Sequence, residues 1–281
     1  MEKQQTLRGK AVYSGITLHT GVRATLKINP APENTGIWFR RVDVTGTPSV
    51  RAVASNVVDV RRGTTISGNG ATVGTVEHIM ASLHACGVDN AIVDMDGPEP
   101  PILDGSAREY FAGIIATGLE EQSAEAAVFR PSAPIHVNGG HTQMVIAPHQ
   151  EDSLRVFCTT SFAGCPFDPQ FMEIEITREN FEKEIAPART FVAFDDLRQL
   201  LSMGLIRGGS LDNAAIMHGG AIFCKEKLLW QNEIVRHKIL DITGDLFLCG
   251  KRVRGCVIAV KPGHPRNVEL ATAMMAQDAK S

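Results

Sequence analysis

The sequence lacks several patterns that identify common classes of protein. No apolar run is long enough to cross a bilayer, and the N-terminal segment MEKQQTLRGK is too polar for a secretory signal. Lysine and arginine form no dense basic stripe, so a nucleic-acid partner is not expected. We therefore expect a cytoplasmic protein without a transmembrane segment, in at most transient contact with membranes.

Familiar metal and nucleotide signatures are also missing. The six cysteines are scattered without a C-x-x-C pair, and most lie in apolar runs, which favours reduced core cysteines. The HExxH motif of metalloproteases is absent, and the glycine-rich GGSLDN and GNG lack the Lys-Ser/Thr of a phosphate-binding P-loop. A site in this chain must therefore be found from the spacing of other residues.

The length of the chain favours two domains. With 281 residues it is long for one hydrophobic core, and the acidic, polar segment EEQSAEAA suggests a boundary near residue 126. The two domains would then cover residues 1–126 and 127–281.

An internal repeat supports this division. EHIMASLHACG in the first half resembles RHKILDITGDLFLCG in the second, and each is followed by a predicted strand, a glycine-containing turn and a helix. Aligning His78 with His237 places Gly105 opposite His264, because both offsets are 27 residues. If the repeat is genuine, two similar α/β domains face each other across a pseudo-twofold axis, with the site at their interface.

The most informative segment is RHKILDITGDL, residues 236–246. His237, Asp241 and Asp245 are spaced four residues apart, so on a helix they share one face. The other faces are almost entirely apolar, which predicts a buried helix. Imidazole and carboxylate groups inside such a helix are costly unless something pairs with or coordinates them. The spacing indicates a metal site, with a paired polar group as the alternative.

A third ligand could come from the other half of the repeat. His78 lies near the start of a predicted helix that has Thr75 as its N-cap, and two imidazoles with one carboxylate form a ligand set that suits a catalytic zinc. Glu77 directly precedes His78 and could accept a proton from the attacking water, although a glutamate in a first turn is also ordinary helix chemistry. His264, in a predicted turn, is a candidate acid that Asp245 could orient.

Several segments together resemble one known family. They are VEHIMASL (76–83), PPILDGSA (100–107), APARTF (186–191), RGGSLDNA (207–214), RHKILDITGDL (236–246) and GHPRN (263–267). In this order they resemble the zinc-dependent UDP-3-O-acyl-N-acetylglucosamine deacetylases of lipid A biosynthesis. The resemblance runs from about residue 5 to 275 and implies a Gram-negative-type bacterium as the source. It also implies hydrolysis of the N-acetyl group of UDP-3-O-[(3R)-3-hydroxyacyl]-N-acetylglucosamine to UDP-3-O-acyl-glucosamine and acetate.

The resemblance implies a role for each site residue. One Zn²⁺ per chain would be held by His78, His237 and Asp241. The catalytic residues would be Glu77 as base, His264 as acid with Asp245 beside it, Thr190 at the oxyanion and Lys238 next to the active site. Substrate-binding residues would be His19, Phe162, Phe191, Gly209 and Ser210. From the sequence alone, Thr190 could equally be a turn residue and His19 a solvated one.

The family's fold would be α+β, with two similar two-layer sandwiches and the site between them, and its second domain carries a βαβ insert that forms an apolar passage for the acyl chain. Residues 191–217 fit this insert, although an amphipathic helix packed on the core would have the same pattern. The partner would be the UDP-linked acylated amino sugar, and we expect a monomer. Two other functions stay open: a zinc amidohydrolase acting on a different acylated amino sugar, and a non-catalytic sensor of nucleotide sugars.

Overall fold

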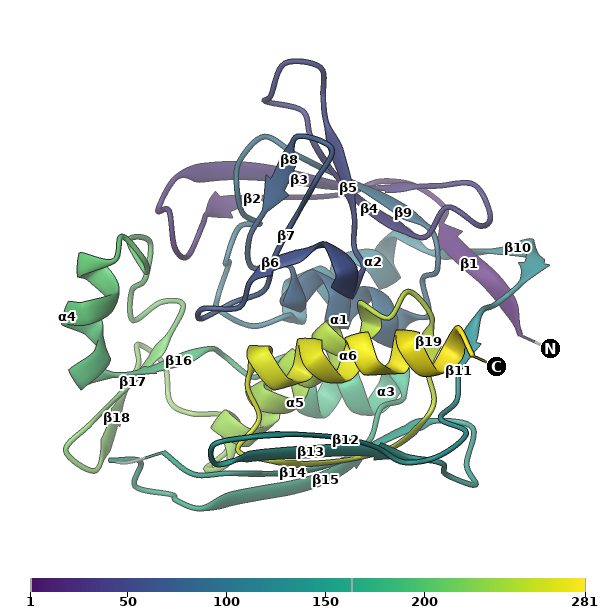
Figure 1. The fold of residues 1–281 in the computed structure, drawn as a ribbon. Coiled ribbons are helices and arrows are strands. Elements are labelled where there is room, and N and C mark those ends of the chain that lie inside the picture. The colour runs from purple at the N-terminus through teal and green to yellow at the C-terminus, as the bar shows by residue number, and fades with distance from the viewer. Residues whose placement is uncertain (1, 163, 281) are drawn as a thin grey trace.

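A computed structural model describes residues 2–162 and 164–280. Two five-stranded sheets form the outer layers, and the longer helices lie between them (Figure 1). The first sheet has the order β2 (Ala11–Ile16), β3 (Arg23–Pro30), β9 (Ala91–Met95), β4 (Ile37–Arg41) and β5 (Ser49–Arg51). The second has the order β12 (Ile135–Gly139), β13 (Thr142–Ala147), β20 (Gly255–Val260), β14 (Leu154–Thr160) and β15 (Gln170–Glu175). The predicted α+β class is confirmed.

The two sheets share one topology. In the first, β9 pairs antiparallel with β3 and parallel with β4. In the second, β20 pairs in the same way with β13 and β14. In the chain, β9 follows the helix Glu77–Cys86 and β20 follows the helix Glu233–Phe247. The repeat expected from the sequence is therefore present in the order and pairing of these elements. The pseudo-twofold axis and the domain boundary near residue 126 stay proposals.

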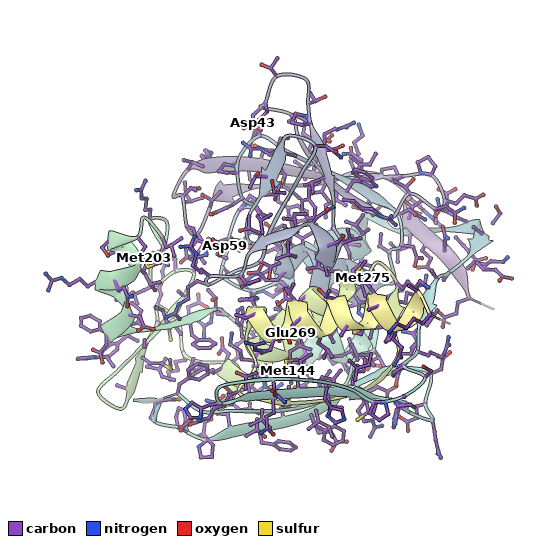
Figure 2. The ribbon with its side chains drawn as sticks, in the orientation of Figure 1. Asp43, Asp59, Met144, Met203, Glu269 and Met275 are labelled. Atoms are coloured by element: carbon purple, nitrogen blue, oxygen red, sulfur yellow. The ribbon has the colours of Figure 1, made fainter. Side chains whose placement is uncertain are left out.

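The space between the sheets is filled by helices α1 (Glu77–Cys86), α2 (Arg108–Thr117), α5 (Glu233–Phe247) and α6 (His264–Asp278). Helices α1 and α5 pack directly against each other, and α6 covers α5, β12 and β13. Figure 2 shows Glu269 and Met275 on α6, above Met144 of the second sheet, whose side chain is buried. Helix α5 is buried along almost its whole length, as its apolar faces predict.

Two local expectations were wrong. Thr75 is not the N-cap of α1; Val76 holds that position, and Thr75 has a positive φ of 54°. His264 begins α6 instead of lying in a turn, because Pro265 needs no N–H partner in the first turn of a helix. The polar segment before residue 126 is partly the strand β10 (Leu119–Glu125), which pairs with β1 (Lys3–Leu7).

The expected insert is a βαβ unit. Strand β16 (Phe191–Ala193) leads into α4 (Phe194–Ser202), and β17 (Ala215–His218) returns parallel to β16. Strand β18 (Ala221–Phe223) completes this small sheet. The unit projects from one side of the layered body (Figure 1), and Figure 2 labels Met203 beside its helix.

Shorter elements complete the chain. They are η1 (Ala54–Asn56), β6 (Val57–Asp59), β7 (Thr65–Gly68), β8 (Ala71–Val73), β11 (Val128–Phe129), α3 (Arg178–Asn180), η2 (Phe181–Ile185) and β19 (Arg252–Val253). Asn69 and Gly70 form the turn between β7 and β8, and both have the positive φ angles that a tight hairpin turn requires. Among the described residues, no helix has both the length and the apolar character needed to cross a membrane.

Candidate active site

Three buried side chains from the two central helices converge. His78 comes from the first turn of α1, whereas His237 and Asp241 lie one turn apart on α5. One donor atom from each residue lies within 4.8 Å of the other two. The structure therefore brings together the three residues that the sequence predicts as metal ligands.

The hydrogen bond made by His237 leaves its other ring nitrogen free to bind a cation. The Nδ1–H of His237 donates to the carbonyl oxygen of Ala188 at 3.0 Å, which leaves a lone pair on Nε2. This Nε2 faces Oδ1 of Asp241 at 3.5 Å. A lone pair opposite a carboxylate oxygen is unfavourable unless a cation lies between them. Two tetrahedral zinc ligands with bonds of about 2.0–2.2 Å lie roughly 3.3–3.6 Å apart, so the spacing fits.

The protonation states suit a metal as well. Burial and the neighbouring His237 lower the pKa of His78 to about 3. Burial also lowers the pKa of His237, so both imidazoles are neutral. Burial alone would raise the pKa of Asp241, but Lys238 and the nearby histidines hold it below its usual value. Two neutral imidazoles and one carboxylate are the forms that bind a divalent cation.

Glu77 is poised to exchange a proton near neutral pH. Its side chain is buried at the start of α1, and Oε2 accepts a hydrogen bond from the main-chain N–H of Thr64 at 2.9 Å. Burial raises the pKa of Glu77 to about 7. This is the range in which a carboxylate works as a general base.

His264 is held by a buried carboxylate, as the sequence predicts. Its Nδ1–H donates to Oδ2 of Asp245 at 2.8 Å, and Asn267 Nδ2 donates to the same oxygen at 2.9 Å. Burial alone would lower the pKa of His264, but the carboxylates of Asp245, Asp241 and Glu77 raise it to about 9. The imidazole is therefore protonated at neutral pH and can act as an acid.

Lys238 contacts both the metal trio and an aromatic ring. Its Nζ donates to Oδ2 of Asp241 at 2.7 Å and lies 5.2 Å from the ring centroid of Phe191. Phe191 also packs edge-on against Phe162 with a centroid separation of 4.8 Å. The two predicted aromatic residues and the lysine thus form one wall beside the metal trio.

These groups line one cavity of about 220 Å³. Its lining includes all the predicted catalytic and metal residues except Asp245: Glu77, His78, Thr190, His237, Lys238, Asp241 and His264, with Phe162 and Phe191. Asp245 lies behind His264 with no exposed surface. The main chain of Thr190 is fixed by Gly105 and Ala215, so the loop that carries it is well defined.

A second cavity of about 240 Å³ adjoins the first, because Leu18, Arg62, Thr190 and Phe191 line both. Its other walls are largely apolar and come mostly from the insert: His19, Val192, Leu197, Leu200, Leu201, Ile206, Gly209, Ser210, Ala214 and Ile216. The three predicted substrate-binding residues outside the first cavity, namely His19, Gly209 and Ser210, all lie here. The insert therefore builds an apolar passage that leads from the polar site.

His19 joins the loop between β2 and β3 to the insert. Its Nδ1 accepts the main-chain N–H of Ile206 at 3.4 Å, and its Nε2 lies 3.2 Å from the carbonyl oxygen of Arg62. Burial lowers the pKa of His19, so the ring is neutral. It is a buried wall residue of the passage, which excludes the solvated alternative.

Sequence reasoning missed three residues in contact with the predicted ones. Thr64 contacts Glu77 and Asp245, and Asn267 shares Asp245 with His264. Arg62 lines both cavities and forms an ion pair with Asp196 of the insert at 2.5 Å. Asn267 ends the GHPRN segment of the resemblance but was given no role, and Thr64 and Arg62 stand at no recognisable spacing from a ligand.

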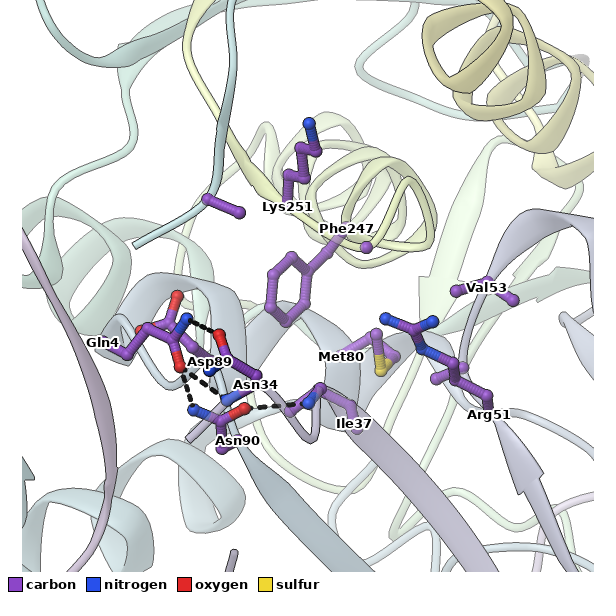
Figure 3. A pocket seen from close by; sticks show the side chains of 14 residues that line it. Gln4, Asn34, Ile37, Arg51, Val53, Met80, Asp89, Asn90, Phe247 and Lys251 are labelled. Atoms are coloured by element: carbon purple, nitrogen blue, oxygen red, sulfur yellow. Dashed lines mark hydrogen bonds between the residues drawn. The ribbon is translucent and has the colours of Figure 1, made fainter. Parts of the chain in front are cut away.

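A different cavity, of about 160 Å³, lies beside the C-terminal end of α5, where Phe247 and Lys251 line it together with Met80 of α1 (Figure 3). Its amide side chains bond to one another: Gln4 Nε2 donates to Asn34 Oδ1 at 2.9 Å, and Asn90 Nδ2 donates to Gln4 Oε1 at 2.8 Å. Asn90 Oδ1 accepts the N–H of Gly36 at 2.8 Å. The amide groups of this cavity thus satisfy one another, as polar groups do in the interior of folded proteins.

Comparison with known proteins agrees with this geometry. The family model of UDP-3-O-acyl N-acetylglycosamine deacetylases (LpxC) matches residues 4–276. A UDP-3-O-acyl-N-acetylglucosamine deacetylase of Geobacter sp. (strain M21) is 42% identical over 272 residues, covering 97% of this chain and 88% of the relative. The bifunctional enzyme LpxC/FabZ of Bacteroides thetaiotaomicron is 39% identical over 300 residues, covering 98% of this chain and 64% of that relative. The chain therefore belongs to the LpxC family of UDP-3-O-acyl N-acetylglycosamine deacetylases.

Proposed function

We propose that this chain is a zinc-dependent deacetylase of lipid A biosynthesis. It would remove acetate from the 2-amino group of a UDP-3-O-acyl-N-acetylglucosamine and release UDP-3-O-acyl-glucosamine. The observation that carries the proposal is the junction of a buried His-His-Asp trio with an apolar passage, in a chain of this family. The trio would hold a metal ion that activates water for hydrolysis, and the passage suits a fatty acyl group.

His78, His237 and Asp241 would hold one Zn²⁺ per chain. When bound there, the ion supplies a Lewis acid for the acetyl carbonyl and lowers the pKa of a water molecule to about 7. The second oxygen of Asp241 is held by Lys238, which keeps the carboxylate in place. Carboxylate ligands oriented in this way bind metal more firmly than free ones.

Glu77 would accept the proton of the attacking water. The hydrogen bond from Thr64 fixes Oε2, and Oε1 remains for the water. Because the pKa of Glu77 is raised to about 7, the group can both take up and release a proton near neutral pH.

His264 would protonate the departing amine. An amide nitrogen leaves poorly as an anion, so its expulsion needs a proton at Nε2 of His264. Nδ1 is committed to Asp245, which leaves Nε2 as the free donor position, 4.0 Å from Oδ2 of Asp241 and therefore beside the metal trio. The raised pKa keeps that proton in place until it is needed.

Thr190 would donate its hydroxyl hydrogen to the oxyanion that forms on the acetyl oxygen, a fixed donor of the type that stabilises such charge. Lys238, with Phe162 and Phe191 beside it, would face the nucleotide-sugar part of the substrate. His19, Gly209 and Ser210 would line the acyl chain.

The experiment is a deacetylation assay on purified protein with matched substrates. We expect release of acetate from the 3-O-acylated UDP-sugar, abolished by chelation and restored by Zn²⁺. Removal of either the UDP or the acyl chain should lower kcat/KM strongly. Full activity on a substrate without UDP would favour the alternative amidohydrolase.

The sensor alternative is less well supported. A sensor needs binding but no proton transfer, whereas Glu77, His264 and Thr190 all line the cavity with the metal trio. Binding of the acylated UDP-sugar without acetate release, in zinc-loaded protein, would favour the sensor. A cytoplasmic location and a monomeric chain are further proposals, to be tested by cell fractionation and by light scattering during size-exclusion chromatography.

A further inference from the structure

Thr64 contacts the proposed base, Glu77, through its main chain and Asp245, which holds the proposed acid, through its side chain. It directly precedes β7 and has no exposed surface. Its main-chain N–H donates to Oε2 of Glu77 at 2.9 Å, and its carbonyl oxygen accepts the N–H of Val76 at 3.2 Å. The main chain of Thr64 therefore makes hydrogen bonds with two successive residues at the start of α1, Val76 and Glu77.

The side chain of Thr64 contacts Asp245, the partner of His264. Its hydroxyl donates to Oδ1 of Asp245 at 2.6 Å. The opposite oxygen, Oδ2, accepts Nδ1–H of His264 at 2.8 Å and Nδ2–H of Asn267 at 2.9 Å. Because the hydroxyl has one hydrogen, its 3.3 Å contact with Nδ1 of His264 is secondary to the bond with Asp245.

We propose that Thr64 is a positioning residue for the acid of the reaction. Its hydroxyl fixes the rotation of the Asp245 carboxylate, so that Oδ2 stays on Nδ1 of His264 and Nε2 stays directed at the cavity. Asp245 has no exposed surface, so no bulk water can replace a lost donor on Oδ1. Without the hydroxyl, the carboxylate turns to satisfy both oxygens and carries the imidazole out of line.

The substitution Thr64→Val isolates the hydroxyl. Valine has nearly the same shape and retains the main-chain N–H that bonds Glu77. We expect kcat to fall about tenfold to a hundredfold, the range for a lost hydrogen bond to a charged group, with KM and metal content unchanged. Thr64→Ser keeps a hydroxyl and should retain most of the activity.

Thr243→Val is the matched control. Thr243 is as fully buried as Thr64, but its hydroxyl bonds to the carbonyl oxygen of Ile239 within its own helix. The substitution Thr243→Val should leave kcat within about twofold of the parent chain. The hydrogen bond that it removes joins two uncharged groups of one helix and is weaker than a hydrogen bond to a charged group. A Thr64→Val enzyme as active as this control, or a Thr64→Ser enzyme as slow as Thr64→Val, overturns the proposal.

A double-mutant cycle tests whether Thr64 acts through Asp245. If it does, Thr64→Val should have almost no effect on kcat in an Asp245→Asn background, because the two changes remove the same interaction. Losses that multiply independently would show that Thr64 acts elsewhere.

A spectroscopic measurement separates this role from the proposed function, on which the kinetic tests rest. In proton NMR, the Nδ1 proton of His264 should resonate far downfield in the parent chain and in Thr64→Ser, and should shift upfield or broaden in Thr64→Val. If it does so in a chain that releases no acetate, the positioning role stands and the deacetylase proposal fails. If the parent chain is active and the resonance is the same in Thr64→Val, the positioning role is wrong.

Discussion

Gly244 of α5 lies directly against the carbonyl oxygen of Glu77 on α1. A Cβ atom at position 244 would overlap this oxygen and lie 3.1 Å from the nitrogen of Ala81. Because His78 follows Glu77, and Asp241 lies one turn before Gly244, the close approach of the two helices sets the separation of the metal ligands. A residue without a side chain is required at the crossing point.

The first prediction follows from this contact. In an ordinary helix, Gly→Ala stabilises by about 1 kcal/mol, but overpacking costs roughly 1–3 kcal/mol or more. Gly244→Ala should therefore lower the free energy of unfolding in urea and weaken metal binding, since α1 must move away from α5. Gly9→Ala is the control, because the nearest atom to its added Cβ, Thr117 Cγ2, lies at an ordinary 3.4 Å. A stabilised Gly244→Ala protein with normal metal content would contradict the crossing argument.

The second prediction concerns the metal ligands. Substituting any of the three by alanine should abolish stoichiometric zinc in the purified protein, measured by atomic absorption. Zinc at a concentration of 100 Kd should raise the free energy of unfolding of the parent chain by about 2.7 kcal/mol, because only the folded chain has the assembled site. The exposed His141 is the control, and His141→Ala should keep both the metal and the stabilisation. Full zinc occupancy in His237→Ala or Asp241→Ala would disprove the ligand set.

The third prediction is a bell-shaped dependence of kcat/KM on pH. Activity needs Glu77 deprotonated, so it should rise as the pH passes the Glu77 pKa of about 7. It also needs His264 protonated, so it should fall as the pH passes the His264 pKa of about 9. His264→Gln should lose the alkaline limb and about 100-fold or more in rate.

Asp245→Asn tests the cause of the alkaline limb. Because the Asp245 carboxylate helps to raise the pKa of His264, its neutral replacement should move the alkaline limb to lower pH. An unchanged profile in both His264→Gln and Asp245→Asn would show that another group supplies the proton.

The sequence alone predicted the parts of the site that depend on local spacing. His237, Asp241 and Asp245 stand on one face of α5 because a helix brings every fourth residue together, and the repeat paired His78 with His237. The mixed fold and the βαβ insert were predictable from the resemblance, whose motifs follow the chain in order.

Contacts between distant loops were not predictable. Thr64 reaches Asp245 across 181 positions of the chain and Arg62 reaches Asp196 across 134, so no periodicity connects them. The residue type of Thr75 favours a helix cap, but its backbone adopts a positive φ that the tertiary structure imposes. The glycine and proline that flank His264 predict a turn, although proline also suits the first turn of a helix, where the structure has it.

The fourth prediction concerns the apolar passage. Ala214 is buried and lines the second cavity, so Ala214→Leu should fill space that the proposed acyl chain occupies. Each methylene excluded from an apolar environment costs about 0.8 kcal/mol, or roughly fourfold in kcat/KM. If the added side chain displaces two methylene groups, kcat/KM for a long-chain substrate should fall about fifteenfold, by the same conversion. A short-chain substrate should be nearly unaffected, and metal content should not change.

The exposed Ala133 is the control, and Ala133→Leu should affect neither substrate. Equal losses for both chain lengths in Ala214→Leu would mean that the passage does not hold the acyl chain.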